Sequence, residues 1–478
     1  MRLLTPTRRG AAALLLIAAA LLPSGAGGQG AGNVLPKLPF TKFVMKNGLT
    51  VLLSENHAAP TVSVWMVYRV GRGDFDPGRT GFAHLFEHVM FEGSAHVARG
   101  EHSKLVKESG GATNATTWED YTDYFDTDLP SNMLETALWL EADRMAFLPA
   151  ALDSAHFDLA RQSVYNEHTL RTVGVNVVPP GVLAAEAFAT NLLPSSRYSV
   201  PVFGYMEDLA RSSVADVRSF FDRYYGPNNA TLAISGDFKT ASARALVEKY
   251  FGGIPARARP ASAHPAIAPL AGEKRIALED QYANTYRLWI GWHGASTKGA
   301  DRMALSVLNS ILAGGRGSRL SRAVTDAAKA GTVAESAHSD LDDSGIFQIG
   351  VAGLPNASLT RLEQLVDSVT ADVRDHGVSD IELKRWVATY VDTTLSSLQL
   401  NATRAKVLAE GQSLNGDPSA ALNDIATVRR LTPADLQRVA RQYLTGDRLV
   451  LSIVPKGKLD LVSKPELPYT NVTKKVTP

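Results

Sequence analysis

A helix-to-strand unit that occurs twice constrains the fold of this chain more than any other feature. Residues 213–235 read as an amphipathic helix that begins at a capping serine and is followed by a strand. The same order of a capped helix and a strand returns at residues 432–453. Because a capping residue before an apolar stripe marks the start of a helix, the sequence predicts two homologous halves, residues 36–253 and 274–470.

Strand and helix patterns within the halves place the chain in the α+β class. Residues 43–53 read as a hairpin around Asn47–Gly48, and residues 61–70 read as a long strand. Long helical segments alternate with such strands, so we expect each half to be a sheet covered by helices. Residues 254–273 begin with a stretch rich in proline and alanine, and they are predicted to be the linker between the halves.

The segment His84-Leu85-Phe86-Glu87-His88 carries the clearest chemical signal. On a helix, residues three and four positions apart are neighbours, so His84 and His88 can share a metal ion while Glu87 reaches its bound water. The order is the reverse of His-Glu-x-x-His, as in the inverzincins. A surface helix with three solvated polar groups is the alternative. The apolar flanks predict a buried helix, and a buried His-Glu-His cluster needs a partner such as a metal ion.

A catalytic zinc ion needs three protein ligands and an open position, so a third ligand is expected on another element. Residues 153–167 read as a helix capped by Asp153 or Ser154. Glu167 falls on its apolar stripe, whereas His168 falls on a different face, so Glu167 is the better candidate. The stripe consists of Phe157, Ala160, Val164 and Glu167.

Over residues 38–460 the chain resembles the pitrilysin/insulysin family of zinc peptidases, and within it the shorter chains like mitochondrial processing peptidase and its bacterial relatives. Residues 81–94 resemble the metal-binding helix of that family. Residues 110–124 are similar to its Gly-Gly-x-x-Asn-Ala-x-Thr-x-x-Asp-x-Thr-x-Tyr block, and residues 164–167 match the place of its third ligand. The resemblance implies two similar sandwich halves that face each other across a cavity.

The resemblance also implies a role for the motif residues. One zinc ion per chain would be held by His84, His88 and Glu167. Glu87 would act as the general base that takes a proton from water attacking a peptide carbonyl, and it could pass that proton to the leaving amine.

Three further residues of the Gly-Gly block receive roles in the same way. Asn114 and Ala115 would lie on an edge strand along which a peptide is added as another strand; the alternative for Asn114 is a turn residue after the two glycines. Asp120 is a candidate hydrogen-bond acceptor for the other ring nitrogen of a ligand histidine, although a helix or turn cap would explain it almost as well.

Two departures from the family pattern bear on catalysis. The family often carries another glutamate seven residues before the third ligand, and here that position is Ala160. In its C-terminal half the family places an arginine and a tyrosine that contact substrate, and here those positions align with Asp326 and Val333. We therefore expect a heterodimer in which a homologous partner subunit supplies the Arg/Tyr pair. The alternative is a homodimer or monomer that uses a nearby group such as Arg319 or Arg322.

The N-terminus predicts export. Residues 1–28 combine basic residues, a short apolar run and small residues, as in a cleaved secretory signal peptide. The pair Arg8–Arg9 faintly resembles a twin-arginine signal, but a plain basic region is the favoured interpretation. The chain has no cysteine, which excludes a disulfide and a lipoprotein anchor, and its net charge of +1 gives no sign of nucleic-acid or membrane-surface binding. A soluble periplasmic or extracellular protein is expected.

These observations lead to one functional hypothesis with two alternatives. We expect an exported zinc endopeptidase that hydrolyses short or unfolded peptides in a closed chamber. The first alternative is a non-catalytic peptide-binding or assembly subunit that keeps the fold. The second is a zinc hydrolase that acts on a non-peptide substrate.

Overall fold

The computed structural model of the chain describes residues 37–173, 182–258, 267–281, 283, 285–355 and 357–473. The predicted signal peptide and the middle of the predicted linker lie outside these residues. Among the described residues, no helix has the length and apolarity needed to cross a membrane.

The first half contains a six-stranded sheet with strand order β1-β2-β6-β3-β5-β4. The predicted hairpin is confirmed: the first two strands pair antiparallel across a turn in which Gly48 has φ of 89°, a conformation that favours glycine. β4 lies at one edge of this sheet and pairs only with β5 among the described strands. The strands are β1 (Thr41–Val44), β2 (Thr50–Glu55), β3 (Thr61–Tyr68), β4 (Ala112–Thr117), β5 (Thr122–Pro130) and β6 (Ala230–Gly236).

The second half repeats this topology in the order β12-β7-β11-β8-β10-β9. β7 and β11 are parallel, as β2 and β6 are, and the remaining pairs toward β9 are antiparallel, as they are toward β4. The two sheets differ in their sixth strand, because β1 is antiparallel to its neighbour and β12 is parallel. The strands are β7 (Lys274–Asp280), β8 (Arg287–Gly294), β9 (Gly331–Asp340), β10 (Gly345–Gly353), β11 (Leu449–Pro455) and β12 (Thr470–Asn471).

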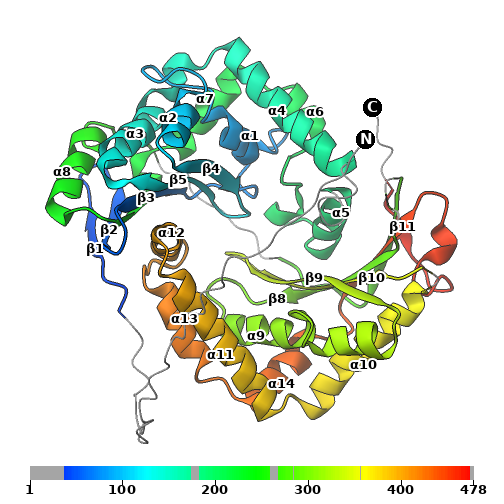
Figure 1. The fold of residues 1–478 in the computed structure, drawn as a ribbon. Helices are drawn as coiled ribbons and strands as arrows, with labels where there is room; N and C mark the ends of the chain where they lie inside the picture. The colour runs from blue at the N-terminus through cyan, green and yellow to red at the C-terminus, as the bar shows by residue number, and fades with distance from the viewer. Residues whose placement is uncertain are drawn as a thin grey trace, which may run out of the picture. The chain divides into compact units, whose positions relative to one another are not determined.

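The helix-to-strand repeat is confirmed in detail. α7 (Val214–Tyr224) leads into β6, and α14 (Pro433–Tyr443) leads into β11. Each helix begins with a capping box in which a hydroxyl and an aspartate satisfy each other's backbone N–H groups, Ser213 with Asp216 and Thr432 with Asp435. The α+β prediction with two homologous halves therefore holds (Figure 1).

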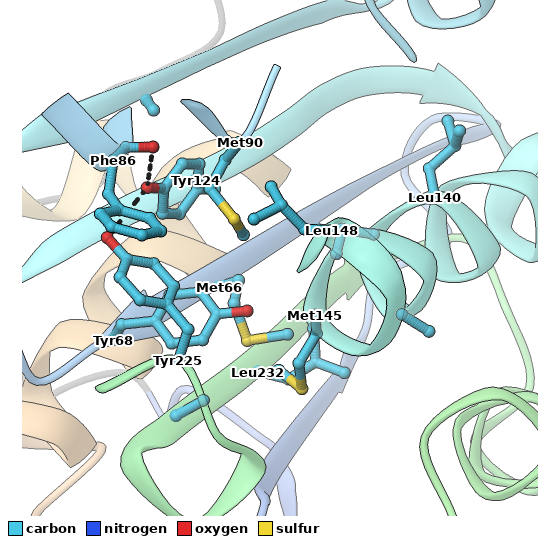
Figure 2. Packing of buried hydrophobic residues seen from close by; sticks show 14 of the residues in the cluster. Met66, Tyr68, Phe86, Met90, Tyr124, Leu140, Met145, Leu148, Tyr225 and Leu232 are labelled. Carbon is cyan, nitrogen blue, oxygen red and sulfur yellow. Dashed lines mark hydrogen bonds between the residues drawn. The ribbon is translucent and has the colours of Figure 1, made fainter. Parts of the chain in front are cut away.

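Helices cover one face of each sheet and enclose its main core. Figure 2 shows part of the first core, where Met66 and Leu232 of the sheet lie near Met145 and Leu148 of α3. In the first half the main helices are α1 (Phe82–Val89), α2 (Glu101–Glu108), α3 (Leu134–Ala151), α4 (Ser154–Val173), α6 (Met206–Ala210), α7 and α8 (Thr240–Phe251). In the second they are α9 (Arg302–Ala313), α10 (Leu359–His376), α11 (Asp380–Ser397), α13 (Ala420–Val428) and α14.

The other face of each sheet is covered by a helix that belongs to the opposite half. α12 (Asn401–Glu410) follows the second sheet's helices in sequence, yet it packs on β3 and β6 of the first sheet (Figure 1). Conversely, α5 (Val182–Leu192) of the first half packs on β8 and β11 of the second sheet. The buried residues of these two contacts form small cores of their own. This exchange joins the halves through apolar contacts rather than through the linker alone.

We predict that the α12 contact contributes strongly to stability. Leu408 is fully buried in the small core between α12 and the first sheet, so Leu408→Ala should lower the free energy of unfolding by about 2–5 kcal/mol. Leu400→Ala, at the start of the same helix, is the control, because Leu400 is 62% exposed and should cost little. Urea unfolding of both variants checks this. If both variants lower the free energy of unfolding equally, the contact of α12 with the first sheet contributes no more to stability than an exposed position does.

Candidate metal centre

The structure brings together the three residues that were predicted from the sequence to be metal ligands. His84 and His88 lie on α1, and Glu167 lies on α4, which packs against α1. The Nε2 atom of His88 is 3.1 Å from Oε2 of Glu167, and the Nε2 atom of His84 is 3.4 Å from the same oxygen. One ligand atom of each residue thus lies within 4.8 Å of the others.

This spacing fits a zinc ion. Zinc binds imidazole nitrogen and carboxylate oxygen at about 2.0–2.2 Å, so ligand atoms at tetrahedral angles lie about 3.3–3.6 Å apart. Two imidazoles and one carboxylate are also a donor set found in catalytic zinc sites. The side chain of His84 is 4% exposed, whereas His88 and Glu167 are about a quarter exposed. A fourth position toward solvent is consistent with this gradient.

The charge of Glu167 is stabilised by its neighbours. Burial alone would raise the pKa of this carboxyl, but hydrogen bonds with His84 and His88 and the charge of Arg171 together lower the pKa below its usual range. Arg171 lies one helical turn after Glu167, and its guanidinium is 2.5 Å from Oε1. Glu167 is therefore ionised, as a metal ligand must be.

Glu87 lies in the same turn of α1 as the two histidines, and it is partly exposed. Its carboxylate makes no hydrogen bond or ion pair with another described residue, in contrast to Glu167. The side chain is thus not held by a competing group among the described residues, and it lies in the helical turn that carries the two candidate ligands. Its role as a base stays a prediction.

A second buried cluster is a poorer metal site. His102, Asp126 and Glu141 also lie close together. However, His102 is 3.1 Å from both carboxylate oxygens of Asp126, and Arg144 forms two hydrogen bonds with Glu141. These ion pairs already satisfy the groups that a metal would need, so the cluster is a buried salt-bridge network.

A close backbone contact fixes the start of the metal-binding helix. Gly81, which precedes α1, and Gly204 both have positive φ, at 80° and 68°. A Cβ atom on Gly204 would lie 2.4 Å from the backbone nitrogen of Gly81, so only glycine allows this approach. Asp208 of α6 accepts hydrogen bonds from the backbone and hydroxyl of Thr80. Next to this contact, the ring of Phe203 packs edge-on against the imidazole of His84, with the two ring centroids 4.6 Å apart.

The edge-strand expectation for Asn114 and Ala115 is met by the structure. Both residues lie in β4, the edge strand beside α1, with Ala115 buried and Asn114 exposed. The hydroxyl of Thr117 at the end of β4 is 3.4 Å from the carbonyl oxygen of Ala83. The turn alternative for Asn114 is wrong, and its contact with substrate stays a prediction.

The predicted role of Asp120 is wrong. Its carboxylate accepts hydrogen bonds from Arg197, from the hydroxyl of Tyr198 and from the backbone N–H of Asp342, and among the described residues none of its hydrogen bonds goes to a ligand histidine. Burial raises the pKa of Asp120 despite the neighbouring Arg197. The Nδ1 atom of His84 has no hydrogen-bond partner among the described residues. Asp120 instead joins the turn after β4 to the turn after β9 in the other half.

The two residues of the second departure, Asp326 and Val333, are also located. Asp326 is exposed on a short helix before β9, and Val333 lies in β9 itself. The guanidinium of Arg319 is held by Glu382, Asp372 and the carbonyl of Gly377. This arginine is therefore committed to the helices of the second half, and Arg322 is the freer of the two alternatives, being 54% exposed.

Sequence reasoning missed several residues that shape the site. Arg171 is four residues after Glu167, and this spacing on a helix could have revealed the ion pair. Phe203 and Gly204 had no such signal, because they approach α1 from a loop far away in the sequence. Tyr124 was part of the matched block but received no role; its hydroxyl donates a hydrogen bond to the carbonyl of Phe86 in α1 (Figure 2).

Two protein-family models match the chain. Residues 50–180, which include His84, Glu87, His88 and Glu167, match the model described as insulinase (peptidase family M16). Residues 212–390 match the model described as peptidase M16 inactive domain. Together the matches cover more than half of the chain, and the candidate metal centre falls entirely in the first.

Individual proteins are similar over most of the chain. The zinc protease PqqE of Helicobacter pylori is 26% identical over 434 residues, which cover 90% of this chain and 95% of that protein. A crystal structure of a protease from Helicobacter pylori has the same fold, with a TM-score of 0.82, 24% identity and coverage of 88% of this chain and all of the other. The first half of the periplasmic protease PqqL of Escherichia coli is also similar in fold, with a TM-score of 0.69 and 18% identity over 87% of this chain and 92% of that one.

We predict that the glycine contact at α1 is needed for metal binding. Gly204→Ala should lower the melting temperature and weaken zinc binding, because its Cβ atom would push α1 away from α4. Gly78→Ala is the matched control: Gly78 has a similar φ of 73°, but a Cβ atom there would meet nothing within 4 Å. The control should show only the backbone strain, about 1 kcal/mol. Thermal melts and zinc analysis that fail to separate the two variants would contradict this account.

Proposed function

The chain belongs to the insulinase family of peptidases (peptidase family M16), and from this membership and the geometry of the candidate metal centre we propose that it is an exported zinc-dependent endopeptidase. The observation that carries the proposal is the approach of His84, His88 and Glu167 with an unheld carboxylate, Glu87, in the same helical turn. A binding protein has no need for a base beside a metal. Three ligands and a base together are what peptide-bond hydrolysis requires.

The chain's own residues divide the chemistry as follows. His84, His88 and Glu167 would hold one zinc ion, which when bound polarises a carbonyl and lowers the pKa of water toward about 7. Glu87 accepts the proton of the attacking water and returns it to the leaving amine. The carboxylate of Glu167, fixed by Arg171, stays charged and keeps its place opposite the two histidines.

β4 supplies the surface on which a peptide is held. A strand with a free edge can bind an extended peptide through main-chain hydrogen bonds, which makes binding depend on an unfolded backbone more than on side chains. Asn114 and Ala115 lie on this strand, and α1 packs beside it. We therefore propose short or unfolded peptides as substrates.

Among its described residues, the second half has no cluster of metal-ligating side chains, and this raises the second candidate function. Its match to the inactive domain agrees with a wall or partner-binding role for this half. A chain that only binds peptides or assembles with a partner would keep the fold and show no turnover. The intact base and ligands of the first half favour the enzyme.

We further propose that catalysis needs a homologous partner subunit. Asp326 and Val333 cannot do the work of an arginine and a tyrosine in orienting a peptide and polarising its carbonyl. Arg319 and Arg322 are the two groups within the chain that could replace such a pair. Arg319 is already held in ion pairs, which leaves Arg322. Export rests on the N-terminal signal pattern, and similarity in fold to a periplasmic protease agrees with it.

We predict that two variants distinguish the role of the metal ligand from the role of the base. Glu167→Ala should lose most of the zinc, because it removes one of three ligands. Glu87→Gln should keep about one zinc per chain yet lose ~10²–10⁴-fold of peptide cleavage, because it removes only the base. Metal analysis and cleavage of a mixed peptide library measure both. Full zinc in Glu167→Ala would remove that residue from the site, and a Glu87→Gln variant with half its activity would assign the base elsewhere.

We predict that the zinc-loaded chain alone is a poor enzyme. Adding a homologous chain that lacks the zinc motif but carries the Arg/Tyr pair should raise cleavage at least ~10-fold, since orientation of the reacting group is worth several kcal/mol. Arg322→Ala should leave the activity of the pair unchanged. Cleavage by the isolated chain that the partner does not raise, together with a sharp loss in Arg322→Ala, would contradict the two-chain proposal.

A further inference from the structure

We propose that Tyr124 is a positioning residue whose hydroxyl holds the turn of α1 that carries Glu87. This inference rests on the proposed function of Glu87 as the base. Tyr124 lies in β5 and is fully buried, and its hydrogen bonds and ring contacts go to described residues other than the candidate metal ligands. Its hydroxyl donates a hydrogen bond of 3.0 Å to the carbonyl oxygen of Phe86 (Figure 2).

A hydrogen bond to the carbonyl of Phe86 can fix the position of the Glu87 backbone. This carbonyl belongs to the peptide group that joins Phe86 to Glu87, so fixing it fixes the orientation of the backbone immediately before the base. It also lies in the last turn of a helix of eight residues, where carbonyls lack full intrahelical partners. The backbone N–H of Met90 gives it one hydrogen bond, at 3.1 Å, and Tyr124 gives the second.

The hydroxyl of Tyr124 is itself oriented. The hydroxyl of Tyr225 lies 3.2 Å from it. Because the carbonyl of Phe86 can only accept, Tyr124 must donate to Phe86 and therefore accepts from Tyr225. The two tyrosines and the carbonyl form a short chain of hydrogen bonds in which each bond strengthens the next.

The ring of Tyr124 is clamped independently of its hydroxyl. The guanidinium of Arg144 lies over the ring, 4.6 Å from its centroid, and is held in turn by two hydrogen bonds to Glu141. The ring of Tyr68 packs edge-on against the ring of Tyr124, with the two centroids 5.8 Å apart. Replacing tyrosine by phenylalanine therefore removes one polar atom and leaves the packing in place.

Tyr124 also links the base to the peptide-binding edge. In the sheet it is the direct partner of Ala115 in β4. One residue is thus bonded through its backbone strand to β4 and through its side chain to α1. His84, His88 and Glu167 would be held in place by the metal that they share, whereas the placement of Glu87 depends on the backbone of its helical turn. The hydroxyl should accordingly matter more for the base than for the metal.

The test compares Tyr124→Phe with Tyr68→Phe in the full chain, with the partner present if activity requires it. The hydroxyl of Tyr68 is buried in the same cluster but has no hydrogen-bond partner among the described residues, so this control removes an idle atom (Figure 2). For Tyr124→Phe we expect kcat per bound zinc to fall about fivefold or more, with KM and zinc content within twofold of the wild type. Tyr68→Phe should match the wild type.

A second measurement does not depend on turnover. Amide hydrogen exchange over residues 82–90 of the zinc-free protein should be faster in Tyr124→Phe and unchanged in Tyr68→Phe. If Tyr124→Phe fails to fold, Tyr225→Phe, which removes the donor to Tyr124, should give a smaller loss in the same quantities. Unchanged kcat and exchange, a loss that follows zinc content, or an equal loss in Tyr68→Phe would each overturn the inference. A wild type without peptidase activity would refute the proposed function, and the exchange result would still decide whether the hydroxyl holds α1.

Discussion

The contact between α1 and α4 is the constraint on which the site depends. A single helix is enough to bring two histidines one turn apart close together. The third ligand comes from a second helix, so its distance from the histidines depends on how the two helices pack. The backbone contact between Gly81 and Gly204, the hydrogen bonds that Thr80 donates to Asp208 and the ring of Phe203 hold the first turn of α1. The hydroxyl of Tyr124 bonds to its last turn. A short helix with little stability of its own thus becomes a rigid support.

The repeated topology explains why one chain carries one candidate metal centre. α1 lies between β3 and β4, and the corresponding position between β8 and β9 is taken by α9. The residues of α9 include no histidine and no carboxylate, and most of them are buried apolar side chains. The second half therefore repeats the architecture of the first without metal-ligating residues on this helix. Through α5 and α12, each half also buries apolar side chains against the sheet of the other.

The sequence was sufficient to predict those features that depend on residues close to each other in the chain. Capping boxes, the Asn47–Gly48 hairpin, the apolar stripe ending at Glu167 and the i, i+4 histidines all depend on residues within one or two turns of each other, and the structure agrees with each. Contacts between distant segments were not predictable in this way. Gly204 approaches Gly81 from more than a hundred residues away, and nothing near either glycine specifies its partner.

The error at Asp120 shows what such local reasoning cannot see. Asp120 lies in the turn between β4 and β5, and its partner Asp342 lies in the corresponding turn between β9 and β10. Equivalent turns of the two halves therefore meet, and Arg197 and Tyr198 bridge their carboxylates. A carboxylate near a metal motif is readily assigned to the metal, but here it pairs with Arg197 of the same half and accepts a hydrogen bond from the backbone N–H of Asp342 in the other half. Because this turn follows β4, the hydrogen bond from Asp342 ties the second half to the end of the edge strand beside α1.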